Sequence, residues 1–401
     1  MCSEFCIFVF RSIGVLYHFS LVLPRGLTGL RVDNLVRIMY VFFMKILGIE
    51  TSCDETACAV VEDGERVLSN VIFSQASVHA LTGGVVPEVA AREHILKILP
   101  VIEEALEKAG CDWSSIDALA VTKGPGLISS LIIGTEVVSV ISYLKSKPVI
   151  PVHHIIGHVY ANFLRGDGDE AEDEARPEFP ILILTVSGGH NELLLMRGHG
   201  DFTVLGETRD DAAGEAFDKV ARILGLGYPG GPLIAKAAEK GSRTAFDLPR
   251  SYLEKGSLDF SFSGLKTAVL NEVKGFLKRK GASTVGEDLP AKFKADLAAS
   301  FEEAVVDVLT DKLMQAEINL REEGVQIAEI HLAGGVSANT RLREVLTHKL
   351  AGRDVKIRWP HAISYCTDNA AMIAGAAYYL RESSLKAGAN ITPTTSFDLS
   401  W

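Results

Sequence analysis

The sequence predicts a mixed α/β protein with two lobes, and two patterns support this prediction. Short apolar runs of strand length alternate with longer helical runs along most of the chain. A strand, a tight polar turn and a second strand occur at 45–61 and again at 179–196, and each copy opens a new series of elements. The two copies share an architecture but little residue-level similarity, so a duplication is indicated only at the level of the fold.

The first lobe is expected at 44–176. Apolar spacing and glycine turns predict its elements in order: the hairpin at 45–61, a strand at 66–73, a helix at 88–108, a strand at 118–122, a glycine turn at 123–126, a helix to residue 144 and a helix starting near His153. Residues 165–178 contain seven acids, two glycines and almost nothing apolar, which predicts an exposed loop between the lobes.

The second lobe is expected at 177–367. Its hairpin at 179–196 is followed by a mainly helical insertion at about 210–323 and by a strand, glycine turn and helix from Ala328. The C-terminal segment 368–401 is predicted to form a helix and a tail that packs back toward the first lobe. With 401 residues and 47% hydrophobic content, the chain is large enough for two or three globular domains.

Residues 1–43 have a different character. They are rich in Phe, Val, Leu and Ile, contain few acids and show no clear helical or strand period. Phe5 to Leu23 is long enough for a membrane span, but Arg11 and His18 interrupt it and no tidy cleavage site follows. We interpret Met44 as the true start and residues 1–43 as an extension outside the fold, with a transit peptide as the alternative.

Two histidines suggest a metal site. His154 and His158 are four residues apart on the predicted helix, so both imidazoles project from one face. The later segment Cys366–Asn369 contains Asp368, which supplies the carboxylate that the pair lacks. Three ligands would leave coordination positions open for a substrate. The alternative is a pair of helix-surface or hydrogen-bonded core histidines.

Four glycine-bearing turns at strand ends predict a nucleotide site. Glycine lets the backbone approach a ligand and directs N–H groups at phosphate oxygens; the turns are 124–126, 187–190, 228–232 and 334–339. None has the GxxxxGK[ST] pattern, which disfavours a P-loop nucleotidase.

Three carboxylates lie beside these turns. Asp54 and Glu55, in the first hairpin turn, could accept a proton, order a water or simply cap the turn. Asp218 could accept hydrogen bonds from ribose hydroxyls or form an ion pair with Arg222 at i+4.

The charge and cysteine content restrict the partners and the compartment. A net charge of −11 excludes a protein whose whole surface binds nucleic acid, so RNA would need a local basic patch or another subunit. Six cations within 341–358 form one candidate patch, and a solvated helix face is the alternative. The six cysteines form no CxxC pair, which indicates a reducing compartment and a cytoplasmic protein.

Taken together, these motifs resemble the tRNA N6-adenosine threonylcarbamoyltransferase family. They occur in the order typical of that family between Met44 and about Gly375: 50–56, 83–88, 153–158, 187–190, 210–219, 228–232, 259–267, 334–339 and 366–369. The resemblance implies the actin/heat-shock/sugar-kinase (ASKHA) fold, an α/β fold of two lobes, here with a helical insertion in the second lobe.

The resemblance also implies an activity and site residues. Family members transfer the threonylcarbamoyl group from threonylcarbamoyl-AMP to N6 of adenosine 37 in tRNAs that read codons beginning with A. The metal ligands would be His154, His158 and Asp368. The substrate-binding positions would be Thr185, Val186, Ser187, Gly188, Gly189, Asp218, Gly231 and Asn339. Asp54 or Glu55 would accept the amine proton.

Cofactors and partners follow from the same resemblance. One divalent metal ion per subunit is expected, iron or zinc, and magnesium could enter with a nucleotide. The expected partners are tRNA, threonylcarbamoyl-AMP, a paralogous ASKHA protein (TsaB-like) and a small ATPase (TsaE-like), with no membrane association.

The sequence departs from the family pattern at three positions. Ile156 stands where many members have Glu, and Thr82 stands where an aromatic residue is usual. Asn191 stands where Thr usually follows the Ser-Gly-Gly-His motif. None of the three removes a proposed ligand. One alternative is a metallopeptidase. It is disfavoured because HExxH has glutamate directly after its first histidine, where this chain has Ile155, followed by Ile156. The other alternative is a non-catalytic ATP-binding scaffold of the same fold.

Overall fold

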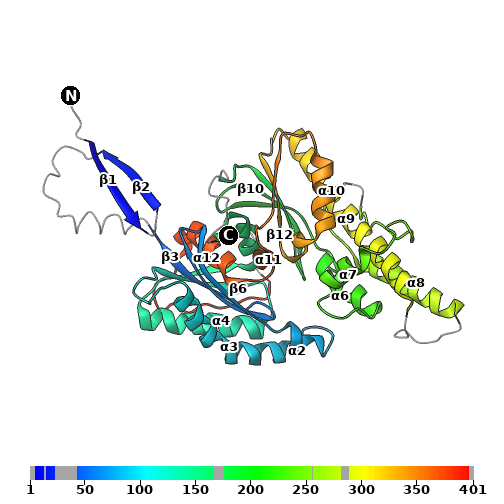
Figure 1. Cartoon of the computed structure of the whole chain (residues 1–401), viewed down its shortest axis with the longest axis horizontal. Helices are drawn as coiled ribbons and strands as arrows, with labels where there is room; N and C mark the ends of the chain where they lie inside the picture. Colours follow the sequence, from blue (N-terminus) through cyan, green and yellow to red (C-terminus); the bar gives the residue numbers. More distant parts are fainter. Residues whose placement is uncertain are drawn as a thin grey trace. The chain divides into compact units, whose positions relative to one another are not determined.

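The computed structural model describes residues 5–12, 15–22, 43–166, 176–254, 256–280 and 289–396. The chain divides into two compact units, Met1–Met44 and Lys45–Trp401. The first unit contains an antiparallel pair of strands, β1 (Phe5–Ser12) and β2 (Val15–Val22) (Figure 1). These two segments thus form strands although their sequence shows no clear strand period. Their aromatic and β-branched residues favour strands even without an alternating pattern.

The second unit begins with a six-stranded sheet in the order β7-β6-β3-β4-β5-β8. Neighbours β3, β4 and β5 are antiparallel, whereas β6 and β7 run parallel to β3. The strands are β3 (Lys45–Glu50), β4 (Glu55–Glu62), β5 (Arg66–Ser74), β6 (Ala118–Gly124), β7 (Val149–His153) and β8 (Arg165–Gly166). The first predicted hairpin is thus confirmed. The predicted acidic loop lies largely outside the described residues.

Helices cover both faces of this sheet. On one face pack α3 (Pro87–Lys108) and α4 (Ile128–Lys145), which bury Leu47, Ile49 and Val60 beneath them. On the other face packs α12 (Ala370–Tyr379), so closely that a Cβ at Gly48 would lie 2.6 Å from the Ala370 carbonyl oxygen. Figure 1 shows α3 and α4 on the side of the sheet away from α12. A short helix, α2 (Ala76–Ala80), precedes α3.

The second sheet has five strands in the order β11-β10-β9-β12-β13. Its strands are β9 (Ile181–Val186), β10 (Asn191–Gly198), β11 (Asp201–Glu207), β12 (Glu329–Ala333) and β13 (Lys356–Arg358). The predicted hairpin is the antiparallel pair β9–β10, and β12 runs parallel to β9. In β9 and β10, alternate residues such as Leu184 and Leu193 enter a large apolar core.

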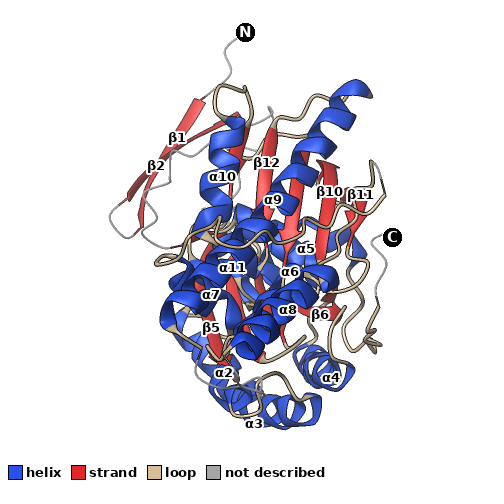
Figure 2. Ribbon diagram, turned by 90° about the vertical axis from the view of Figure 1, so that its right-hand side faces the viewer, coloured by secondary structure: helices blue, strands red, loops and turns tan. Residues whose placement is uncertain are grey.

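Helices fill the other side of that core, as the periodicity predicts. They are α6 (Ala213–Ile223), α7 (Gly230–Ala238), α8 (Ser263–Arg279), α9 (Ala291–Glu322) and α10 (Thr340–Leu350). In Figure 2, α9 and α10 lie on one side of the second sheet, near β12.

A short helix, α5 (His154–Tyr160), lies between the two sheets. It contacts β6 and β7 of the first sheet, β9 and β12 of the second, and α12. All seven of its residues are buried. A Cβ at Gly157 would come within 2.7 Å of the Ile373 side chain, so glycine allows α5 and α12 to pack closely. Because α5 is enclosed, its two histidines need partners inside the protein.

Among the described residues, α4 is long and apolar enough to cross a bilayer by length and composition. It packs against α3 and β6, and the core helices of globular proteins often share this composition.

Candidate functional site

The three predicted metal ligands come together in the structure. His154 and His158 project from α5, and Asp368 lies between α11 (Ile363–Cys366) and α12. Their ligand atoms all lie within 4.8 Å of one another; Asp368 Oδ1 is 3.6 Å from His154 Nε2 and 3.2 Å from His158 Nε2.

Capping residues next to the ligands fix where each helix begins. The side chain of His153 accepts a hydrogen bond from the Ile155 N–H, so α5 starts at the first ligand. The side chain of Asn369 accepts one from the Met372 N–H, which places Asp368 immediately before α12. The sequence therefore sets the ligand positions through local caps.

The histidines and carboxylates at the triad shift one another's pKa values. Burial lowers the pKa of His154, but Asp368 and Glu50 outweigh burial and raise it to about 9. Burial raises the pKa of Asp368, but the two histidines lower it to about 2. A proton on His154 thus balances two buried carboxylates, and a divalent metal ion would replace that proton.

The residues present fit a metal ion. Burial lowers the pKa of His158, which keeps that imidazole neutral. Both of its ring nitrogens are buried, and neither forms a well-oriented hydrogen bond with a described residue. Two imidazole nitrogens and one carboxylate oxygen are a donor set that zinc and iron accept.

Asp54 lies on the turn between β3 and β4, and Glu55 is the first residue of β4. The Tyr228 hydroxyl is 3.5 Å from Asp54 Oδ2, and the Ser74 hydroxyl donates to Glu55 Oε1 at 3.1 Å. Burial, together with the charges of Asp54 and Asp368, raises the pKa of Glu55 well above its ordinary value. Asp368 is therefore close enough to the turn for the two sites to interact electrically.

A buried histidine from α3 holds this turn at both ends. His94 Nδ1 is 2.8 Å from the Thr56 hydroxyl, and Nε2 is 3.0 Å from the Cys53 carbonyl oxygen. Burial lowers the pKa of His94, so the ring is neutral and carries one donor and one acceptor, as these two contacts require. The turn is thus fixed from outside its own hairpin.

The glycine turn after β9 is anchored at its base and open at its tip. A Cβ at Gly214 would lie 2.5 Å from the Ser187 carbonyl oxygen, and one at Gly334 would lie 2.5 Å from that of Val186. By contrast, a Cβ at Gly188, Gly189 or Gly231 would meet no described heavy atom within 4 Å. The backbone of these three glycines is therefore accessible to a ligand.

The predicted substrate residues differ in what their side chains do. Thr185 is buried, and its hydroxyl has no hydrogen-bond partner among the described residues. The Val186 side chain packs in the apolar core, which leaves only its backbone for binding. The Ser187 hydroxyl bonds within its own turn, to His190. Asn339 caps α10 and donates to Glu302.

Asp218 lies in α6, and its carboxylate accepts a hydrogen bond at 2.6 Å from the N–H of Gly230, the first residue of α7. Burial raises its pKa, and Arg222 opposes this only through its charge. The predicted contact with Arg222 is therefore a longer-range attraction. The Asp218 carboxylate and the accessible Gly231 backbone lie at the same helix end.

Three groups near the triad have no predicted role: Glu50, which is fully buried, and His190 and Glu192, which are partly buried. Burial and the nearby histidines lower the pKa of His190 to about 4. Burial and the charge of Glu207 raise the pKa of Glu192 to about 7, and its Oε2 has no partner among the described residues. An acid within the largely apolar strand β10 is the signal that could have marked Glu192, whereas Glu50 ends β3 and gives no such signal.

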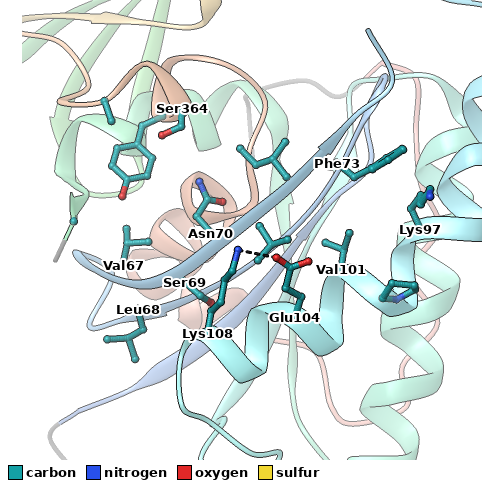
Figure 3. A pocket seen from close by; sticks show the side chains of 16 residues that line it. Val67, Leu68, Ser69, Asn70, Phe73, Lys97, Val101, Glu104, Lys108 and Ser364 are labelled. Carbon is teal, nitrogen blue, oxygen red and sulfur yellow. Dashed lines mark ion pairs between the residues drawn. The ribbon is translucent and has the colours of Figure 1, made fainter. Parts of the chain in front are cut away.

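A cavity of about 860 Å³ lies away from the triad, along β5 (Figure 3). It is lined by β5 residues, by α3 residues that include the ion pair Glu104–Lys108, and by Ser364 and Tyr365. No predicted ligand or substrate residue lines it.

Residues 66–375 match the model of the family described as tRNA N6-adenosine threonylcarbamoyltransferase. The chain belongs to this family. A curated member from Thermomicrobium roseum is 52% identical over 357 residues, which cover 86% of this chain and 94% of that protein. A member from Bacillus subtilis strain 168 is 49% identical over 333 residues, which cover 83% and 89%. Both carry the family's name, and no finding favours a peptidase or a scaffold.

The likeness to solved structures supports the fold. The chain is similar to full-length HypF in its phosphate- and nucleotide-bound form, with a TM-score of 0.50 and 14% identity, over 84% of this chain and 55% of that one. The predicted ASKHA fold, the family and the acyltransferase class are therefore confirmed.

Proposed function

We propose that this enzyme transfers the threonylcarbamoyl group of threonylcarbamoyl-AMP to N6 of adenosine 37, in tRNAs that read codons beginning with A. The observation that carries the proposal is the His154–His158–Asp368 triad, set between the proton-accepting turn and an open glycine turn in a chain of this family. The N6–C bond forms, the bond between the carbonyl carbon and the phosphate oxygen breaks, and AMP leaves.

The triad would hold one divalent metal ion, zinc or iron, with magnesium entering only with a nucleotide. When bound, such an ion supplies Lewis-acid stabilisation of negative charge on substrate oxygens. Around it, the N–H groups of Gly188, Gly189 and Gly231 would bind phosphate oxygens, because no side chain blocks their approach. Asp218 would accept from a ribose hydroxyl with the carboxylate oxygen that Gly230 leaves free.

Asp54 is the carboxylate best suited to accept the N6 proton. Burial, the Asp54 charge and a hydrogen bond with Asp54 raise the pKa of Glu55 well above its ordinary value, so Glu55 is the carboxyl that keeps a proton more readily. Asp54 lies beside it, 3.5 Å from the Tyr228 hydroxyl, and would be the base of the pair. His94 would hold the turn during proton transfer.

We do not place the tRNA contact on the basic run at 341–358, because most of its cations are paired within the fold. Five of its six cations pair with acids: Arg341 with Glu303, Lys349 with Asp311, Arg353 with Glu317, Lys356 with Glu178 and Arg358 with Glu329. The C-terminal end of α8 instead presents four exposed cations without an ion pair to any described residue: Lys274, Lys278, Arg279 and Lys280. We assign tRNA phosphate binding to this basic end of α8.

A protein partner would bind the outer face of α3 and α4. These packed helices expose neighbouring large apolar side chains, among them Leu96 at 64%, Tyr143 at 74% and Leu144 at 68%. Such an apolar face is typical of a protein interface. It would suit a paralogous ASKHA protein, and a small ATPase would complete the system in the cytoplasm.

The same proposal includes the division of the chain. The first lobe would span 44–176 and the second 177–367, residues 368–401 would return to the first lobe, and residues 1–43 would lie outside the fold. The packing of α12 against β3 and β4 supports the return of the C-terminal segment.

Release of AMP tests the proposal. Purified protein, supplied with its partners and threonylcarbamoyl-AMP, should release AMP in proportion to added tRNA that carries adenosine 37. A transcript with guanosine at that position is the matched control and should release none above background. AMP release that is independent of tRNA would contradict a transferase and support a hydrolase.

A further inference from the structure

Glu50 is a fully buried carboxylate beside the metal triad. It is the last residue of β3 and has no exposed surface. Its partners among the described residues are the Ser52 N–H, the Thr122 hydroxyl and His154 Nδ1, and they include no lysine or arginine. An ionised carboxylate is costly to bury without a cation, so its retention needs a reason.

The contact with His154 supplies that reason. Glu50 Oε2 lies 3.3 Å from Nδ1, while Nε2 of the same ring faces Asp368 Oδ1 at 3.6 Å. A histidine that binds a metal through one ring nitrogen usually donates the N–H of its other nitrogen to a carboxylate, which fixes its tautomer and orientation. In His154, Nδ1 faces the Glu50 carboxylate, and Nε2 faces the third proposed ligand, Asp368.

We infer that Glu50 is a positioning residue for the metal centre, which accepts the Nδ1–H of His154 and so directs the Nε2 lone pair at the ion. The inference rests on the metal site of the proposed function. In this role Glu50 would act through His154 and would not itself be a metal ligand.

The same carboxylate links the metal centre to the turn that carries Asp54. Its Oε1 accepts from the Ser52 N–H, and the Ser52 hydroxyl is also 3.2 Å from His154 Nδ1. The Thr122 hydroxyl on β6 holds Oε2 in place. A change at Glu50 therefore moves a metal ligand and the base of the turn together.

Zinc affinity tests the inference without relying on activity. Zinc is titrated into metal-free protein in competition with a chromogenic chelator, for the unmodified chain, Glu50→Gln and the control Glu62→Gln. Glu62 also belongs to this sheet, but its ion pairs are with Lys45 and Arg66, away from the triad. Glu50→Gln should bind zinc roughly 10- to 100-fold more weakly, and Glu62→Gln should bind it like the unmodified chain.

Two further measurements keep the test decisive. If Glu50→Gln does not fold, Thr122→Val is the second variant. It removes the hydroxyl that donates to Glu50 Oε2 but leaves the carboxylate in place, and it should still weaken zinc binding several-fold. In zinc-loaded protein, imidazole nitrogen NMR should show His154 protonated at Nδ1, and Ser52→Ala should preserve that signal because Glu50 remains.

Unchanged zinc affinity in a folded Glu50→Gln protein, or loss of the signal in Ser52→Ala alone, would overturn the role of Glu50. An unmodified chain that binds no zinc or iron would instead remove the metal site of the proposed function, and the role of Glu50 with it.

Discussion

Replacing Glu192 by Gln should make the stability of the metal-free protein less dependent on pH. The folded protein holds a proton on Glu192 up to a pKa of about 7, compared with an ordinary value of 4.5. Between these values the native state binds the proton and the unfolded chain has released it, so native stability falls as pH rises from 4.5 to 7. Over 2.5 pH units this loss is at most about 3.4 kcal/mol, at 1.36 kcal/mol per unit.

Urea unfolding of chelator-treated protein at pH 5 and pH 8 measures this effect. The free energy of unfolding of Glu192→Gln, taken relative to that of the unmodified chain, should be about 2–3 kcal/mol higher at pH 8 than at pH 5, because glutamine carries no charge to bury. Glu104→Gln, which removes a half-exposed partner of Lys108, is the control and should change by less than about 1 kcal/mol at both. An equal free-energy difference at pH 5 and pH 8 for Glu192→Gln would refute the reasoning.

Three other changes test the site. His154→Ala, His158→Ala and Asp368→Ala should each reduce bound metal from about one ion per chain to near zero without unfolding, as read by elemental analysis and circular dichroism; full occupancy in all three would remove the site. Asp218→Ala should weaken adenylate binding by about 1–3 kcal/mol in calorimetry and leave tRNA binding unchanged; equal nucleotide affinity would return Asp218 to a purely structural role at α7. Lys274→Ala with Lys278→Ala should reduce the salt dependence of tRNA binding by about one counterion per lysine, whereas the ion-paired Arg353→Ala should not; the reverse order would restore the 341–358 patch.

The sequence predicted what depends on local spacing. His154 and His158 are one helical turn apart, so their common direction follows from helix geometry, and the structure confirms it. The hairpins at the start of each sheet follow equally from alternating apolar residues and polar turns. Local spacing could not pair Asp368 with the histidines, because its position in space depends on the long stretch of chain between them. Only the family motif at 366–369 indicated that it is the third ligand.

Features that depend on partners distant in the sequence were not predictable. The cations of 341–358 form a basic run in the sequence, but Glu303, Asp311 and Glu317 of α9 neutralise three of them in the fold. Glu50 ends a strand, where an acid is often solvent-exposed, and only the fold brings His154 against it. Strand β1 could not be predicted from alternation, because Phe5–Phe10 is continuously apolar.

Nucleoside mass spectrometry of a tRNA after reaction tests the central claim most directly. Purified protein with its partners, zinc or iron, and threonylcarbamoyl-AMP should convert adenosine 37 to N6-threonylcarbamoyladenosine, and Asp368→Asn should leave the same tRNA unmodified while remaining folded. Modification at an undiminished rate by Asp368→Asn, or no modified nucleoside from the unmodified chain under conditions where AMP is released, would contradict the account.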